Sequence, residues 1–288
     1  MPAFLAVRSE PVGVGESELT YSGKDIALAE AAHAVWFNWL HVIDETLASE
    51  VHGQTHKPFS LWPVVRQGKE LELNIGILSP TLYSCLKRRQ QQFPAVNDLG
   101  LRAFQLRDTL MRVTDVHLSE WVDDEAILDM ALAVPDRYRH LTFRFLTPTS
   151  FRQRGTQLVW PDPRNVWGSL LRRWNQFASV QFPPGLEEEF GQLEVSAYEL
   201  RTSAVRFSGY LVIGFVGYTT YRIPSTLSPA CRQLLFALAH YARYAGIGYK
   251  STMGLGRARW EDGEELVERF QSGRGREGSG RQSSGAVR

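Results

Sequence analysis

The chain of 288 residues has little cysteine and no long hydrophobic run. Its two cysteines, Cys85 and Cys231, are too few for a disulfide framework and too far apart in sequence for a C-x-x-C metal site, so they suit a reducing compartment. No apolar run reaches about 18 residues, and the first residues lack a basic segment followed by a long apolar stretch. We therefore expect a cytoplasmic protein with neither an export signal nor a membrane span.

Motifs for metals and nucleotide cofactors are also missing. The seven histidines form no H-E-x-x-H motif and no cluster with cysteine, so the sequence predicts no metal site and no cofactor. The glycine-rich segment 246–259 is no Walker loop, because Tyr249 stands where the motif needs the glycine before its lysine. It is no dinucleotide fingerprint either, because Ser251 stands where the third glycine belongs.

Net charge is small, +1 by formal count, but the charges are unevenly distributed. Residues 1–140 contain 13 Lys and Arg against 19 Asp and Glu, whereas residues 141–260 contain 14 against 6. The basic C-terminal half favours a polyanionic partner, although arginine is also common on protein surfaces. The Gly-, Ser- and Arg-rich residues 272–288 contain no aromatic residue, and we expect them to form a disordered basic tail.

Hydrophobic residues make up 43% of the chain, enough for folded domains, and their periodicity predicts one order of elements twice: strand, helix, strand, strand, helix, strand. In the first half these are residues 4–7, 25–47, 59–65, 71–78, 80–89 and 106–116. In the second half they are 140–146, 166–177, two strands within 205–223 that break near Gly214 or Gly217, 228–240 and 258–260. This order predicts an α+β protein with tandem ferredoxin-like (RRM-like) domains over 1–136 and 137–271, followed by the tail 272–288.

One segment between the first helix and the second strand collects His52, His56 and Lys57. Histidine suits proton transfer because its unperturbed pKa is near 6.5, and an ammonium stabilises negative charge at a phosphate. A segment with two imidazoles and an ammonium is therefore suited to the cleavage of a phosphate ester. The spacing does not decide between His52 and His56, and an exposed polar loop without chemistry is the alternative. For His33 and His41 we expect surface positions on the first helix, and for His140 and His240 structural ones.

The glycine-rich segment joins the last helix to the last strand. Its glycines, Gly246, Gly248, Gly254 and Gly256, permit positive φ and close approach, so that amides beside the polar side chains could bind a phosphate chain. The polar side chains of this predicted phosphate site are Lys250, Ser251, Thr252 and Arg257, and we expect Arg152, Arg154 and Arg172 to add contacts to RNA. Alternatively, the glycines only let the segment pack beneath the sheet. Arg172 and Arg173 are adjacent, so at least one of them should be solvated.

The segment GIGYKSTMGLGRAR at 246–259 resembles the C-terminal glycine-rich loop of the CRISPR-associated repeat-processing endoribonucleases, the sixth Cas family of the RAMP superfamily. Further segments similar to this family occur in the same order: HKPFSLWPV at 56–64, LTFRFLTPTSFR at 141–152, NVWGSLLRRWNQF at 165–177 and SGYLVIGFVGYTTYRI at 208–223. The resemblance covers roughly residues 30–260. It implies tandem ferredoxin-like domains and an endoribonuclease that cleaves CRISPR repeat RNA (pre-crRNA) without a metal, by 2′-hydroxyl attack, to make crRNAs for antiviral defence.

The resemblance also implies roles for single residues. A histidine just after the first helix commonly acts as general acid or base in this family, and His52 occupies that place; Lys57 matches a lysine that stabilises the phosphorane. Some relatives bind RNA without the catalytic histidine, so the alternative function is a non-catalytic RNA-binding subunit of a CRISPR interference complex. A third class is an enzyme acting on a phosphate ligand other than RNA. Other subunits of an interference complex are further expected partners, and a membrane is not.

Overall fold

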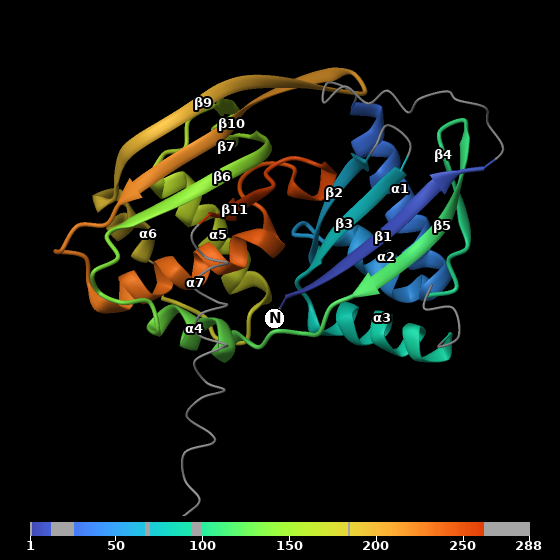
Figure 1. Cartoon of the computed structure of the whole chain (residues 1–288), viewed down its shortest axis with the longest axis horizontal. Coiled ribbons are helices and arrows are strands. Elements are labelled where there is room, and N and C mark those ends of the chain that lie inside the picture. Colours follow the sequence, from blue (N-terminus) through green and yellow to red (C-terminus); the bar gives the residue numbers. More distant parts are fainter. Residues whose placement is uncertain (1, 13–25, 67–69, 94–98, 184, 262–288) are drawn as a thin grey trace, which may run out of the picture.

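Two antiparallel sheets stand side by side in the computed structural model, which describes residues 2–12, 26–66, 70–93, 99–183 and 185–261 (Figure 1). The N-terminal sheet has the order β2-β3-β1-β5-β4 and the C-terminal sheet the order β11-β6-β10-β9. The first contains β1 (Ala3–Pro11), β2 (Phe59–Arg66), β3 (Glu70–Ile77), β4 (Ala103–Leu106) and β5 (Thr109–Leu118). The second contains β6 (His140–Thr149), β9 (Glu194–Phe207), β10 (Tyr210–Arg222) and β11 (Ala258–Trp260). The tandem ferredoxin-like fold is confirmed, with β4 as an addition to the first sheet.

The first predicted helix is two helices, α1 (Ile26–Ile43) and α2 (Glu45–Gly53). The chain breaks at Asp44, whose carboxylate accepts the amide hydrogen of Leu47 at 3.0 Å and so caps α2. Because α2 continues to Gly53, His52 lies in its last turn rather than in a loop. The third helix, α3 (Pro80–Gln92), begins as predicted, with Ser79 as its cap and Pro80 in its first turn.

Two long helices cover one face of the C-terminal sheet, α5 (Pro163–Phe177) and α7 (Pro229–Ala245) (Figure 1). Asp162 and Ser228 cap them, and each cap is followed by a proline. Shorter elements complete this half: α4 (Asp124–Leu132), β7 (Phe151–Gln153), β8 (Thr156–Leu158), α6 (Leu186–Glu189), η1 (Phe190–Gln192) and η2 (Ser251–Met253). No helix within the described ranges is long and apolar enough to cross a membrane.

The hairpin β9–β10 differs from the prediction. The two strands meet at Ser208-Gly209, where Gly209 has a φ of +85°, and not near Gly214 or Gly217. Both of those glycines lie within β10, and Gly217 is located at a shift in the register with β6. Strand β9 begins at Glu194, well before the predicted start at residue 205. The prediction missed this part because most side chains of β9 are exposed and show little apolar alternation.

Each half has its own hydrophobic core. Trp36 and Phe59 belong to the N-terminal core, and Phe143 and Trp167 to the C-terminal core. Helix α4 contributes Ile127 to the C-terminal core although it precedes residue 136. The division at that position therefore stays a prediction, and the predicted tail 272–288 lies outside the described residues.

The two halves meet where β2 and β3 pack against the end of α7 and the glycine-rich segment. Trp62 donates its indole N–H to the carbonyl of Leu255 at 3.1 Å, and the amide of Gly254 donates to the carbonyl of Leu61 at 2.9 Å. Ser60 donates its hydroxyl to the carbonyl of Tyr244. The glycine-rich segment is therefore part of the interface between the halves.

Candidate functional site

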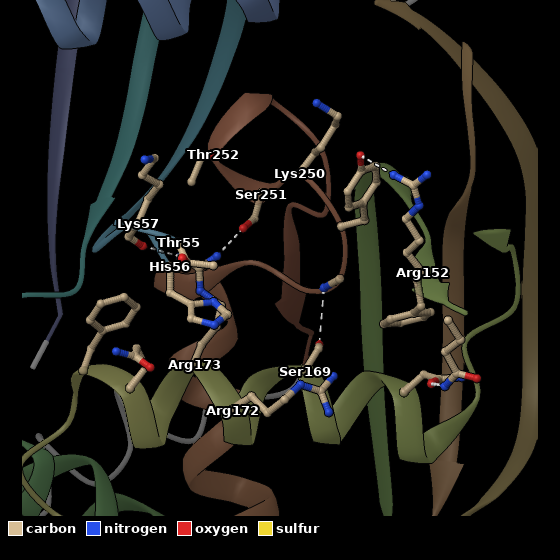
Figure 2. A pocket seen from close by; sticks show the side chains of 17 residues that line it. Thr55, His56, Lys57, Arg152, Ser169, Arg172, Arg173, Lys250, Ser251 and Thr252 are labelled. Atoms are coloured by element: carbon tan, nitrogen blue, oxygen red, sulfur yellow. Dashed lines mark hydrogen bonds between the residues drawn. The ribbon is translucent and has the colours of Figure 1, made fainter. Parts of the chain in front are cut away.

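A cleft of about 450 Å³ opens where the two halves meet (Figure 2). Its walls are the segment after α2, helix α5, strand β7 and the glycine-rich segment. Five of the side chains that line it are cationic: Lys57, Arg152, Arg172, Arg173 and Lys250. No acidic residue is among those that line it in the described chain. The cleft therefore has a positive potential that suits a polyanion.

Arg173 joins three walls of the cleft. One Nη atom donates to the carbonyl of Phe59 at 2.9 Å and to that of Lys57 at 3.5 Å, and the other donates to the hydroxyl of Ser251. Burial lowers the pKa of this guanidinium. Its neighbour Arg172 is exposed and pairs with Glu187 at 3.4 Å. The two adjacent arginines therefore differ: Arg173 links α5 to Lys57, Phe59 and Ser251 by hydrogen bonds, whereas Arg172 faces solvent.

Lys57 closes the C-terminal end of α2. Its Nζ donates to the carbonyl of Gln54 at 2.8 Å and to the carbonyl of His52. Burial lowers the pKa of the Lys57 ammonium. An ammonium has three N–H groups, so these two carbonyls leave one N–H of Lys57 for a further acceptor.

The two predicted catalytic histidines have different surroundings. His52 is exposed, and its ring lies edge-on to Phe37 with the ring centroids 5.2 Å apart. His56 is also exposed and lines the cleft next to Lys57 (Figure 2). The helix and the aromatic contact therefore hold His52, whereas His56 belongs to the connecting segment.

His33 is the residue that the sequence did not reveal. Its ring also contacts Phe37, the residue that His52 contacts, with the His33 and Phe37 ring centroids 4.9 Å apart. The Nδ1 of His33 lies 2.9 Å from the carbonyl oxygen of Thr252. A carbonyl only accepts, so we assign the proton to Nδ1. Burial lowers the pKa of His33, and the charges of Lys57 and His52 act in the same direction. The prediction of a surface position was wrong, because the partner of His33 lies 219 residues further along the chain.

The four glycines of the glycine-rich segment all have a positive backbone φ. Gly248 has a φ of +83° and Gly256 one of +69°, and a Cβ at either position would overlap a backbone carbonyl, of Ser150 or of Ile247. Most of its amides are bonded within the protein: those of Ile247, Gly248, Tyr249, Met253, Gly254, Leu255, Gly256 and Arg257. The expectation of unshielded amides was therefore wrong for most of the segment. The polar side chains of Lys250 and Thr252 line the cleft instead.

The other predicted RNA-binding residues lie in several places. Arg152 lines the cleft, whereas Arg154 is exposed in the turn between β7 and β8. Ser251 is buried and already accepts a hydrogen bond from Arg173. Arg257 is half-buried near the ring of Trp62, and burial lowers the pKa of its guanidinium. The geometry thus brings together Lys57, Arg152, Arg172, Lys250 and Thr252, but not Arg154 or Arg257.

Comparisons with known proteins agree with this arrangement. The family model of the CRISPR-associated endoribonuclease Cas6 matches residues 143–258. The Cas6 endoribonuclease of Mycobacterium tuberculosis (strain H37Rv) is 30% identical over 213 residues, which cover 73% of this chain and 65% of that relative. The match thus spans slightly less than two thirds of the relative. A product complex of the Thermus thermophilus Cas6 superposes with a TM-score of 0.71 at 27% identity, covering 90% of this chain and 100% of the other.

A second Cas6 product complex gives a TM-score of 0.69 at 28% identity and covers 90% of this chain and 99% of its own. The likeness therefore extends over both halves. The chain is thus similar to the Cas6 endoribonucleases in sequence and in fold. The Cas6 family model covers Arg152 and most of the glycine-rich segment, whereas His52, His56 and Lys57 precede the matched residues.

Proposed function

We propose that this protein is a Cas6-type, metal-independent endoribonuclease that cuts CRISPR repeat RNA (pre-crRNA) into guide crRNAs. The observation that carries the proposal is the cleft, which five cationic side chains and the imidazole of His56 line without any acidic residue among them. Such a charge suits the phosphate chain of RNA. The names of the relatives as endoribonucleases and of two solved neighbours as product complexes support the same conclusion.

The proposed reaction needs groups of the chain and water. The 2′-oxygen of the nucleotide before the cut attacks the adjacent phosphorus, and the bond from phosphorus to the 5′-oxygen breaks. One imidazole either accepts the 2′-proton or delivers a proton to the departing 5′-oxygen, and water exchanges the other proton, so that a 5′-hydroxyl and a 2′,3′-cyclic phosphate are left. The third N–H of Lys57 is available to the phosphorane oxygens, where negative charge develops.

Between the two histidines we assign proton transfer to His52. A proton-transfer group is effective when it is held in place, and His52 stands on a helix with its ring against Phe37. The ammonium of Lys57 is bonded to the carbonyl of His52, so the two proposed groups are linked through the backbone. His56 is the alternative, since it lines the cleft directly.

The grip on the RNA is proposed to come from the second half. Arg152, Arg172 and Lys250 offer cations to phosphates, and Thr252 offers a hydroxyl. Arg154 extends this surface beyond the cleft, and Arg257 contributes charge from the interface. Ser251 and the four glycines, Gly246, Gly248, Gly254 and Gly256, shape the wall on which Lys250 and Thr252 stand.

The test is cleavage of the host's repeat RNA in EDTA by the full chain and its variants. We expect His52→Ala to slow cleavage by about 10²- to 10⁴-fold, whereas His117→Ala, at an exposed position on β5, keeps the wild-type rate. A 2′-deoxy substitution at the cut should stop cleavage and spare binding. Full activity of both His52→Ala and His56→Ala would remove the site assignment. Cleavage of the deoxy substrate would refute the mechanism, and an absolute need for added metal would refute metal independence.

A non-catalytic RNA-binding subunit is the less favoured function, because the relatives are named as endoribonucleases. Stable binding of repeat RNA without any product at high protein concentration would favour it. Association with other subunits of an interference complex remains a prediction. A cytoplasmic location also remains one, consistent with the two free and buried thiols of Cys85 and Cys231.

A further inference from the structure

A second hollow of about 510 Å³ lies beside the cleft, between the β7–β8 hairpin and the first residues of β10. The residues that line it are Arg152, Gly155, Gln157, Tyr210, Leu211, Val212 and Tyr249. Two of these, Arg152 and Tyr249, also line the cleft. The hollow is therefore continuous with the proposed path of the RNA.

The walls of this hollow are aromatic rings backed by cations. Tyr210 stacks on Phe207 with an interplanar angle of 9° and a centroid separation of 5.3 Å. The Nζ of Lys250 lies 4.6 Å from the centre of the Phe207 ring, 5.1 Å from that of Tyr210 and 5.5 Å from that of Tyr249. Tyr210 is nevertheless 44% exposed, so part of its surface has no protein neighbour.

Arg152 also lines the hollow and contacts Tyr249. Its guanidinium carbon lies 5.6 Å from the centre of the Tyr249 ring, and its Nη1 donates to the Tyr249 hydroxyl at 3.2 Å. Exposed aromatic rings beside guanidinium and ammonium groups are the surroundings in which proteins stack unpaired nucleobases.

The edge of β10 adds hydrogen-bonding groups. This strand pairs with β9 from Tyr210 onward, but with β6 only from Phe215, so no strand in the described ranges pairs with its second edge before that point. Gln157 donates to the carbonyl of Ile213 at 2.6 Å on this edge. Backbone groups alternate along a strand, so the N–H and C=O of Leu211 point to the same side as those of Ile213. A donor and an acceptor thus lie next to the aromatic wall.

We propose that this hollow, the base pocket, binds one unpaired nucleobase of the repeat RNA, stacked on the exposed ring of Tyr210 and hydrogen-bonded to the main chain of Leu211. The proposal rests on the proposed function, since it takes RNA as the ligand. An extended peptide could pair with the same edge of β10. We favour RNA because the unpaired edge is short, because Arg152 lines both the hollow and the cleft, and because Lys250 of the cleft lies against the rings of Tyr210 and Tyr249.

The proposal is tested by the affinity of an uncleavable repeat RNA, with a 2′-deoxy residue at the cut, for the full chain. We expect Tyr210→Ala to weaken binding by about 5- to 100-fold, whereas Tyr210→Phe keeps it, because stacking needs the ring and not the hydroxyl. The matched control is Tyr198→Ala, an exposed tyrosine on β9 that packs against Trp160. Thermal unfolding of each variant verifies that it is folded.

Abasic RNAs give a second measurement that a misfolded variant cannot imitate. Removing the base that occupies the pocket should weaken binding to wild type more than it weakens binding to Tyr210→Ala, because the variant has already lost the stacking contact. Wild-type affinity of Tyr210→Ala together with no sensitive abasic position would overturn the base pocket and leave the endoribonuclease proposal intact. Failure of wild type to bind or cut repeat RNA would instead overturn the proposed function. Protection of the Leu211 amide from hydrogen exchange by a protein subunit, but not by RNA, would assign the edge to a peptide and overturn the base pocket.

Discussion

The Nδ1 atom of His33 lies 2.9 Å from the carbonyl oxygen of Thr252, so helix α1 of the N-terminal half is hydrogen-bonded to the glycine-rich segment of the C-terminal half. The same helix carries Phe37, against which His52 packs. One helix therefore positions the proposed proton-transfer group on one side and the proposed RNA-binding segment on the other.

Replacing His33 should weaken this connection. We expect His33→Ala to lower the free energy of unfolding by about 1–2 kcal/mol, because it removes a half-buried hydrogen bond and the ring contact with Phe37. His41→Ala, on the exposed face of the same helix, should change it by less than about 0.5 kcal/mol. Urea unfolding measures both. Equal effects of the two substitutions would show that the contact with Thr252 contributes nothing to stability.

Arg173 should matter for stability more than its neighbour does. Arg173→Ala leaves two carbonyls and the Ser251 hydroxyl without their buried donor, and we expect a loss of about 2–4 kcal/mol. Arg172→Ala removes only an exposed ion pair with Glu187, which is worth about 0–1 kcal/mol. Thermal and urea unfolding of the two variants provide the comparison, and similar stabilities would contradict the structural role given to Arg173.

Arg172 should instead influence the salt dependence of RNA binding. If it contacts one phosphate, Arg172→Gln weakens binding and reduces the slope of log affinity against log salt concentration by about 0.7–0.9. Arg222→Gln is the control, since Arg222 pairs with Glu194 on the C-terminal sheet and lines neither hollow. A slope that is unchanged by Arg172→Gln would exclude this arginine from the phosphate path.

His240 should make stability depend on pH. Burial lowers its pKa from 6.5 to about 4, and the charge of Arg243 adds to this effect. Because the unfolded chain takes up the proton more readily, the stability is fully present above pH 6.5 and is lost as the pH falls toward 4. The contribution amounts to about 2 kcal/mol between pH 8 and pH 5.

His240→Phe keeps an aromatic ring against Trp260 and removes the titration. The free energy of unfolding of this variant should therefore fall less between pH 8 and pH 5 than that of wild type. His140→Phe, at an exposed position, should retain the wild-type dependence. An identical pH dependence of His240→Phe and wild type would refute the assignment.

The sequence predicted those parts of the fold that local signals determine. Helices α3, α5 and α7 begin with a capping side chain followed by proline, and each start was predicted at or within three residues of its position. The alternation in β3 and β6 likewise identified both strands. Most of strand β9 was not predicted, because its exposed residues show little apolar alternation. The hairpin turn was predicted at the wrong place, because Gly214 and Gly217 resemble turn residues as strongly as Gly209 does.

The site could be predicted only in part, for a different reason. His56, Lys57, Arg152 and Lys250 were identified by residue type, and the structure places all four around one cleft. The hydrogen bonds of His33 and Arg173 join segments 219 and 78 residues apart, and no local pattern shows such a pairing. The amides of the glycine-rich segment were expected to be open. Some of them bond to carbonyls within the segment, and the partners of the others come from β2, α5, β6 and Ser150, which only the folded chain brings near.

The three hydrogen-bonding partners of Arg173 come from the segment before β2, from β2 itself and from the glycine-rich segment. A chain emerging from the ribosome completes its N-terminal sheet long before Ser251 is synthesised. The residues that line the cleft extend from Thr55 to Thr252, so the cleft is incomplete in any nascent chain that ends before Thr252. The proposed RNA site therefore forms only after nearly the whole described chain has been synthesised.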